Sequence, residues 1–133
     1  MIKISVCDDD EGQLTFFKQC FMEYNEKHKE KIEANFYQSV QSLLNEKKFS
    51  PDVYFLDIEL QDGNGLKLAG KIRTRNSKIP IVFITSHEEF MPEAFHVHAY
   101  QYLNEKKNAQ AVENVLNQLA DYFSEQNQIF SFQ

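Results

Sequence analysis

The sequence predicts an α/β protein, a doubly wound five-stranded parallel sheet flanked by helices. Short apolar runs, which indicate strands, alternate with stretches whose apolar residues recur at helical spacing. Five such β-α units imply a parallel sheet with helices on both faces. The length of 133 residues is enough for one domain with a sizeable core.

The first two units are defined by period and by capping chemistry. "IKISVC" (2–7) predicts a strand that ends at a run of acids. A helix with one apolar face follows, formed by Leu14, Phe17, Phe21 and Tyr24. Apolar residues alternate in 31–37, which predicts the second strand, and Ser39 is a good N-cap for a short helix over 39–47.

The central units are more apolar. The run "DVYFLDI" (52–58) is typical of a parallel strand covered on both faces. The remaining predicted elements are a turn at 61–65, a helix with Leu66, Ala69 and Ile72, a buried strand at 79–85, a weak helix at 88–95, a strand at 98–103 and a last helix with Val112, Val115, Leu119 and Tyr122 on its apolar face.

Composition excludes several classes of protein. Apolar residues make up 42% of the chain, which is typical of a globular protein, and the net charge of −6 argues against a nucleic-acid surface within these residues. The chain begins directly with a strand-like run and has no apolar stretch near the roughly 20 residues of a membrane span. We expect a cytoplasmic protein without a membrane segment, in which Cys7 and Cys20 are reduced.

Polar residues collect where the predicted strands end. They are Asp8 and Asp9 after the first strand, Asp57 after the third, Thr85 and Ser86 after the fourth, and Asn104 and Glu105 after the fifth. Ligands of open α/β sheets bind at this edge. One aspartate after a strand is most often a turn or cap residue, but the ordered set is harder to explain in that way.

The aspartates favour a magnesium site. Two carboxylates about 4 Å apart repel by roughly 4 kcal/mol at an effective dielectric constant near 20. A hard divalent cation removes this repulsion, and Mg²⁺ prefers carboxylates together with waters and phosphate oxygens. The spacing around Asp62 and Leu68 does not fit a calcium-binding loop, and the chain has no P-loop motif.

These residues resemble the receiver domain of two-component response regulators over 2–123. The anchors, in order, are Asp8-Asp9, "FLDIEL" with Asp57, the loop glycine Gly65, "IPIVFITS" with Thr85, and "AYQYL" with Tyr102. The resemblance implies a flavodoxin-like (βα)5 fold with strand order 2-1-3-4-5 and a receiver domain over 1–124. The wording "FLDIEL…GLKLAGKIR" and "FITSHEEF…AFHVHAYQYL" resembles regulators whose output is a LytTR-type DNA-binding domain.

The resemblance also implies a chemistry. Asp57 is the expected phosphoacceptor and takes a phosphoryl group from a histidine of a sensor kinase. Asp9 would bind Mg²⁺ directly and Asp8 through water, and the backbone carbonyl of Glu59 would be a further ligand. Thr85 would then turn inward toward the phosphoryl group, and Tyr102 would move into the vacated space.

The same resemblance carries expectations for partners. Residues 125–133 would link the receiver to a C-terminal DNA-binding domain that lies outside the sequence, so DNA would be contacted only through that domain. Homodimerisation on activation is expected. The protein would not be an enzyme, beyond its own Mg²⁺-dependent phosphorylation and dephosphorylation.

The sequence departs from the family at the end of the fifth strand. Receivers normally have a lysine there, and alignment without a gap places Glu105 at that position. Three interpretations stay open. Lys106, or Lys107, supplies the amine after a one-residue slip; or the lysine is absent and the switch is weakened; or the chain is a phosphate-independent interaction module.

Three further residues border the predicted phosphate position. Ser86 follows Thr85, and Glu59 and His87 lie two residues after Asp57 and Thr85. We expect Glu59 and His87 to tune the lifetime of the acyl phosphate, although both are equally consistent with exposed loop residues. An aspartate-nucleophile phosphohydrolase is the other alternative, but that family expects an aspartate where this chain has Glu59.

Overall fold

The computed structural model describes residues 1–104 and 108–131. Its main sheet has the strand order β2-β1-β3-β6-β7, and all neighbouring strands are parallel. The strands are β1 (Ile2–Cys7), β2 (Ile32–Tyr37), β3 (Val53–Asp57), β6 (Ile81–Thr85) and β7 (Gln101–Asn104). The predicted fold class and the order 2-1-3-4-5 are therefore confirmed, since β6 and β7 are the fourth and fifth long strands.

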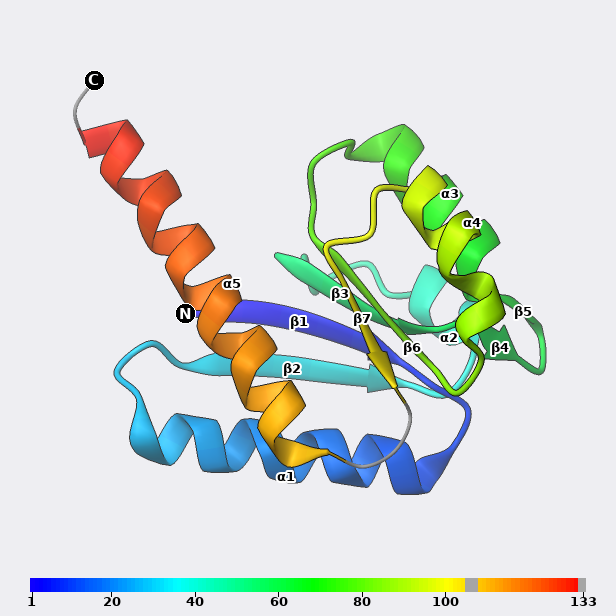
Figure 1. Ribbon diagram of the computed structural model, residues 1–133, viewed down its shortest axis with the longest axis horizontal. Coiled ribbons are helices and arrows are strands. Elements are labelled where there is room, and N and C mark those ends of the chain that lie inside the picture. The colour runs from blue at the N-terminus through cyan, green and yellow to red at the C-terminus, as the bar shows by residue number, and fades with distance from the viewer. Residues whose placement is uncertain (105–107, 132–133) are drawn as a thin grey trace.

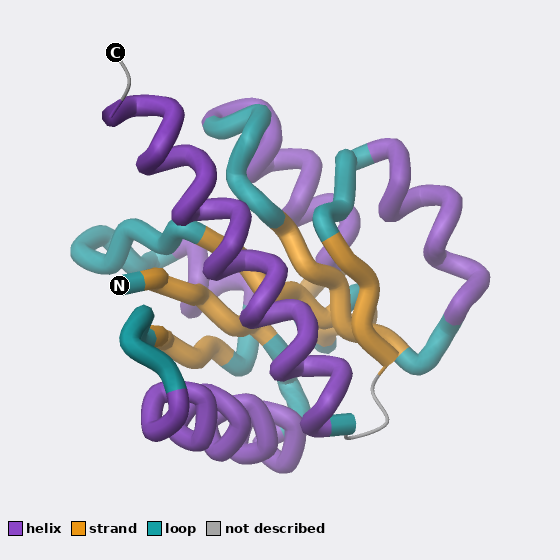
Figure 2. Tube along the Cα trace, turned by 60° about the vertical axis from the view of Figure 1, so that its left-hand side comes forward, coloured by secondary structure: helices purple, strands orange, loops and turns teal. Residues whose placement is uncertain are grey.

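Helices cover both faces of this sheet (Figures 1 and 2). They are α1 (Glu11–Lys27), α2 (Val40–Leu44), α3 (Gly65–Arg75), α4 (Met91–His96), which follows the 3₁₀ turn η1 (Glu88–Phe90), and α5 (Ala109–Ser131). Figure 1 shows α1 and α5 on one side of the sheet and α3 and α4 on the other. A small antiparallel hairpin, β4 (Glu59–Leu60) and β5 (Gly63–Asn64), separates β3 from α3.

Alternation along the buried strands produces two cores, one on each face. Val53 and Phe55 of β3 point toward the side of α1 and α5, whereas Leu56 belongs to the opposite core. The rings of Phe17 and Phe21 in α1 both meet the ring of Phe55 edge-on, with centroids 5.8 Å apart. Edge-to-face pairs of this kind add to the stability that apolar burial provides, and they hold α1 against the strand that ends at Asp57.

Strand register brings the polar strand ends into one row. Cys7 pairs with Leu56, Asp57 with Ile84, and Thr85 with Asn104. Because all five strands run in the same direction, the residues that follow these pairs emerge at one edge of the sheet. The register therefore assembles the site from segments that lie far apart in the sequence.

Some strands and segments begin or end at other residues than the sequence predicts. The last strand begins at Gln101 and not at residue 98, because His98 adopts a positive φ of 55° at the end of α4. The predicted turn at 61–65 lies within and after a short hairpin that begins at Glu59, since β4 precedes the turn and β5 falls inside it. The predicted linker, 125–133, begins within α5, which continues to Ser131, and residues 132 and 133 lie outside the described part. Across residues 1–104 and 108–131, no helix has the length and apolar character that crossing a membrane requires.

Two glycines of α3 provide a matched test of the loop after Asp57. A Cβ at Gly65 would overlap the backbone carbonyl of Asp57, whereas a Cβ at Gly70 would meet nothing within 4 Å. We expect Gly65→Ala to lower the free energy of unfolding by about 2–4 kcal/mol, because backbone must shift. Gly70→Ala should raise it by about 0.5–1 kcal/mol through helix propensity. Urea unfolding measures both, and equal effects would contradict this account.

Candidate functional site

The four acids after β1 divide into two pairs with different roles. Asp8 is 1% exposed, and its Oδ1 accepts a hydrogen bond from the Asp10 amide at 2.9 Å. Asp10 instead caps α1, since its carboxylate accepts hydrogen bonds from the amides of Gly12 at 2.8 Å and Gln13 at 3.4 Å. Asp10 and Glu11 are exposed at the start of the helix, where its dipole favours negative charge.

Asp8, Asp9 and Asp57 form a compact carboxylate cluster. One carboxylate oxygen of each lies within 4.8 Å of the others. Asp57 is 3% exposed at the end of β3, while Asp9 is half-buried. Three oxygens of this kind on a partly open edge fit a hard divalent cation such as Mg²⁺, which takes a few carboxylates and completes its shell with water.

The neighbouring thiol responds to the same negative charge. Burial, followed by the charges of Asp62, Asp8, Asp57 and Asp9, raises the pKa of the Cys7 thiol to about 12. The Sγ atom lies 3.4 Å from the Ser39 carbonyl, to which the thiol donates. Cys7 is therefore a neutral core residue at physiological pH, which agrees with the prediction of a reduced, buried cysteine.

The loop after Asp57 is held from three directions. The Glu59 amide donates to Asp57 Oδ1 at 3.2 Å, and the Gln61 amide donates to Asp9 Oδ2 at 3.0 Å. Asp62 accepts hydrogen bonds from the first amides of α2, those of Val40 at 2.9 Å and Gln41 at 3.1 Å. These bonds lower the pKa of the Asp62 carboxyl. The loop is thus tied both to the acidic cluster and to α2.

Sequence reasoning missed the contacts made by Gln61 and Asp62. In the sequence, the spacing around Asp62 indicates only that this residue does not belong to a calcium-binding loop. Its partners lie 21 and 22 residues earlier in the chain, and a backbone amide such as that of Gln61 has no signature in the sequence. The turn chemistry of "QDGNG" was the only available signal.

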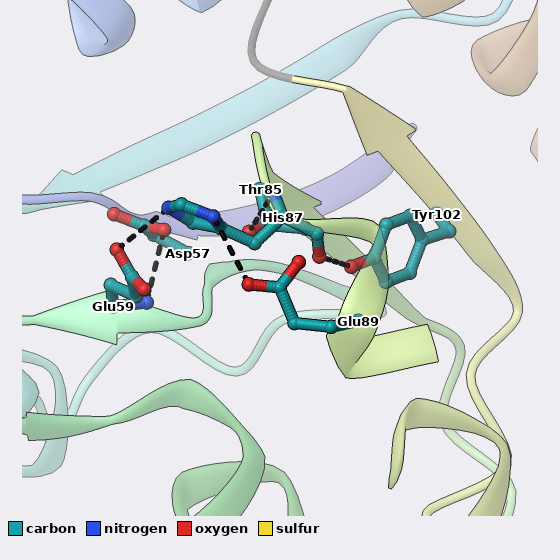
Figure 3. A network of polar contacts seen from close by, with 6 residues as sticks. All are labelled: Asp57, Glu59, Thr85, His87, Glu89 and Tyr102. Carbon is teal, nitrogen blue, oxygen red and sulfur yellow. Dashed lines mark hydrogen bonds and ion pairs between the residues drawn. The ribbon is translucent and has the colours of Figure 1, made fainter. Parts of the chain in front are cut away.

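A chain of polar contacts joins the cluster to β7 (Figure 3). Thr85, 2% exposed, accepts a hydrogen bond at Oγ1 from the His87 amide at 3.1 Å. The Tyr102 hydroxyl donates to the His87 carbonyl at 2.6 Å. Both predicted switch residues therefore hold the backbone of His87, which places this residue at the centre of the network.

The His87 ring lies between two carboxylates. Its Nε2 is 3.4 Å from Glu59 Oε2, and its Nδ1 is 3.3 Å from Glu89 Oε1. Figure 3 shows the ring between the carboxylates of Glu59 and Glu89. These side chains are largely exposed, so the contacts are weak individually, about 0–1 kcal/mol each. These contacts therefore add little to the stability of the fold, and their importance lies in where they place the His87 ring, beside the loop that follows Asp57.

The remaining predicted neighbours are only partly located. Ser86 is exposed, and the structure brings Thr85, His87 and Tyr102 together beside the acidic cluster. Glu105, Lys106 and Lys107 lie outside the described residues. Which of them serves the site therefore stays a prediction.

Comparison with known proteins identifies the family. Residues 4–117 match the response regulator receiver domain. The chain belongs to this family. A response regulatory protein of Yersinia pestis is 29% identical over 120 residues, which is 90% of this receiver and 49% of the relative. The sensory transduction protein LytR of Staphylococcus haemolyticus is 32% identical over 95 residues, 71% of the receiver and 36% of the relative. The receiver thus spans half or less of these relatives.

Solved structures support the same fold. One is the TrrA response regulator of Thermotoga maritima, solved in complex with Mg²⁺ and beryllofluoride. It superposes with a TM-score of 0.76 at 21% identity, and the superposition covers 90% of this receiver and 99% of TrrA. A response regulator from Clostridium difficile gives a TM-score of 0.73 at 22% identity, covering 91% and 97%. At these identities the likeness concerns the fold alone.

The carboxylate cluster predicts how Mg²⁺ affects stability. Asp57→Asn should raise the free energy of unfolding in metal-free buffer by about 1–3 kcal/mol, because it removes one of three repelling charges. Mg²⁺ should raise the melting temperature of the wild type, and Asp57→Asn should weaken this effect. Glu11→Gln, an exposed neighbour, is the control and should respond as the wild type does. Equal Mg²⁺ stabilisation of all three proteins would contradict a metal site at the cluster.

Proposed function

We propose that this receiver accepts a phosphoryl group on Asp57 from a sensor histidine kinase, in a Mg²⁺-dependent reaction, and switches through Thr85 and Tyr102. The observation that carries the proposal is the acidic cluster, with oxygens of Asp8, Asp9 and Asp57 within 4.8 Å, beside the Thr85–His87–Tyr102 contacts. Two comparisons support the proposal: the match to the receiver family, and the similar fold of TrrA, which was solved in complex with Mg²⁺ and beryllofluoride.

In the proposed reaction, a carboxylate oxygen of Asp57 attacks phosphorus while the bond from phosphorus to the kinase histidine nitrogen breaks. The nitrogen keeps the electron pair, and an acyl phosphate forms. Asp8, Asp9, Asp57 and the Glu59 carbonyl would hold Mg²⁺, which neutralises charge on the phosphoryl oxygens. The Glu59 amide, 3.2 Å from Asp57 Oδ1, orients the attacking carboxylate.

The switch follows from the added charge. Phosphorylation brings close to two negative charges to this partly buried edge of the sheet. The Thr85 hydroxyl would turn to donate a hydrogen bond to a phosphoryl oxygen. It would then lose the hydrogen bond that it accepts from the His87 amide at 3.1 Å. Because the Tyr102 hydroxyl binds the same residue, the ring of Tyr102 would move with it.

The output is proposed to be transcriptional. Relatives named LytR include transcriptional regulators of Staphylococcus aureus, of which the matched region is 28%. Residues 125–133 would connect the receiver to a C-terminal DNA-binding domain. Activation would favour a homodimer through the surface of α4 and β7, where Phe95 is 71% exposed beside a pocket of about 170 Å³ lined in part by Met91 and Tyr102.

Phosphorylation is tested directly with a small-molecule phosphodonor and Mg²⁺. We expect intact-protein mass spectrometry to show the gain of one phosphoryl group in the wild type and none in Asp57→Asn. Beryllofluoride with Mg²⁺ should shift the NMR resonances of Thr85, His87 and Tyr102. A chain that does neither would be a phosphate-independent interaction module instead.

The identity of the missing lysine is tested by Lys106→Ala in the same assay. If Lys106 supplies the amine, the variant should lose the beryllofluoride response and label more slowly, because a neighbouring cation at about 5 Å contributes roughly 3 kcal/mol per unit charge. Lys107→Ala tests the alternative in which Lys107 supplies the amine, and Lys78→Ala, at an exposed lysine before β6, is the control. Labelling and switching like the wild type in Lys106→Ala would refute the one-residue slip.

The bridge between Glu59 and His87 predicts the lifetime of the acyl phosphate. Glu59→Gln, which keeps the backbone carbonyl, and His87→Ala should each speed dephosphorylation by about two- to fivefold, because a weak contact that shields Asp57 from water is lost. Glu89→Gln leaves the contact between His87 and Glu59 and serves as the control. Unchanged rates in the first two variants would exclude a role in lifetime.

A further inference from the structure

Helix α4 ends in a well-formed C-terminal cap. The Ala99 amide donates to the Ala94 carbonyl at 3.2 Å, and the His98 amide donates to the Phe95 carbonyl at 3.0 Å. This pair of bonds is the Schellman motif, and His98 occupies the left-handed position, usually glycine, with φ of 55°. A side chain at such a position is strained, so other contacts must hold this end in place.

Arg73 of α3 makes those contacts. Its Nε donates to the Val97 carbonyl at 2.8 Å and its Nη2 to the His98 carbonyl at 2.8 Å. Its Nη1 donates to the Ile79 carbonyl at 2.6 Å and to the Asn76 carbonyl at 3.4 Å. One guanidinium thus joins the end of α4 to the end of α3 and to the segment that leads into β6.

The chemistry of these acceptors explains why an arginine is needed. The last carbonyls of a helix have no partner within the helix and carry partial negative charge. Here two such helix ends, at Asn76 and at Val97, converge on one cation. Only the planar fork of arginine, with its five N–H groups, reaches acceptors in this arrangement, whereas the single ammonium of a lysine does not.

The opposite end of α4 is held differently. Its N-cap is Phe90, whose side chain has no atom that accepts a hydrogen bond. The preceding residues lead back to His87, whose amide and carbonyl contact Thr85 and Tyr102. The N-terminal end of α4 therefore depends on the site, while its C-terminal end depends on Arg73.

We propose that Arg73 is a positioning residue that anchors the C-terminal end of α4, so that the conformational freedom of α4 is confined to its N-terminal end beside His87. Helix α4 would thus pivot about its anchored C-terminal end. The role of this pivot in signalling rests on the proposed function. Arg73 would then determine how a change at Thr85 reaches the surface of α4 and β7, because one fixed end converts a local shift into a rotation.

The anchor is tested first without any phosphoryl mimic, by amide hydrogen exchange followed by NMR. Arg73→Lys should speed exchange at the His98 and Ala99 amides by about tenfold or more, since charged hydrogen bonds to their turn are lost. Core amides such as Phe55 should be unaffected. Arg75→Lys, on the exposed side of the same helix, is the matched control and should behave as the wild type does.

A rescue separates anchoring from a general loss of stability. His98→Gly removes the strain of the positive φ and keeps the backbone carbonyl, so it should slow exchange at Ala99 again in the Arg73→Lys background. Wild-type exchange at His98 and Ala99 in Arg73→Lys would overturn the proposal. So would an equal acceleration at Phe55, which would mean that Arg73 supports only the whole fold.

The pivot is tested by adding beryllofluoride with Mg²⁺. In the wild type, the changes in NMR chemical shift should be large at His87 and Phe90 and small at His98 and Ala99. In Arg73→Lys, large changes should also appear at His98 and Ala99. Large wild-type shifts at His98 and Ala99 would overturn the pivot. An absence of any wild-type response would count against the proposed function instead, and the exchange experiment would still decide the anchor.

Discussion

The mutual repulsion of Asp8, Asp9 and Asp57 is the constraint around which the structure is organised. Parallel strands that are buried on both faces hold the ends of β1 and β3 in fixed register, so these carboxylates cannot move apart without disturbing the core. Charges this close, with two of them nearly inaccessible to water, favour binding of a cation. The site therefore holds unfavourable electrostatic energy that a bound metal ion would release.

Contacts around the cluster partly offset this repulsion. Backbone amides of Glu59 and Gln61 donate to Asp57 and Asp9, and Asp10 is directed away to cap α1. On the other side, the His87 backbone links Thr85 to Tyr102, and so connects the end of β6 to β7. An acidic cluster linked in this way to the neighbouring strand is consistent with the proposed two-state switch.

The fold and the acidic cluster were predictable because they depend on patterns that repeat along the chain. Apolar runs such as 52–58 indicated buried strands, and their ends placed Asp8, Asp9, Asp57 and Thr85 at one edge. The sequence showed a run of acids before the first helix, and the cap that Asp10 forms there is local chemistry that such a run permits. Contacts between distant segments, such as Asp62 with α2, were not predictable, because no periodicity encodes them.

Local patterning in the sequence was thus enough to indicate the main strands and helices, the order in which they alternate and the residue types at the strand ends, but not the β4–β5 hairpin or the start of β7. Tertiary packing alone set the distances among the carboxylates, the placement of His87 between Glu59 and Glu89, and the convergence of two helix ends on Arg73. The reason is physical: side-chain period is a property of neighbouring residues, whereas a hydrogen bond from Arg73 to a carbonyl 24 residues away depends on how α3 and α4 pack.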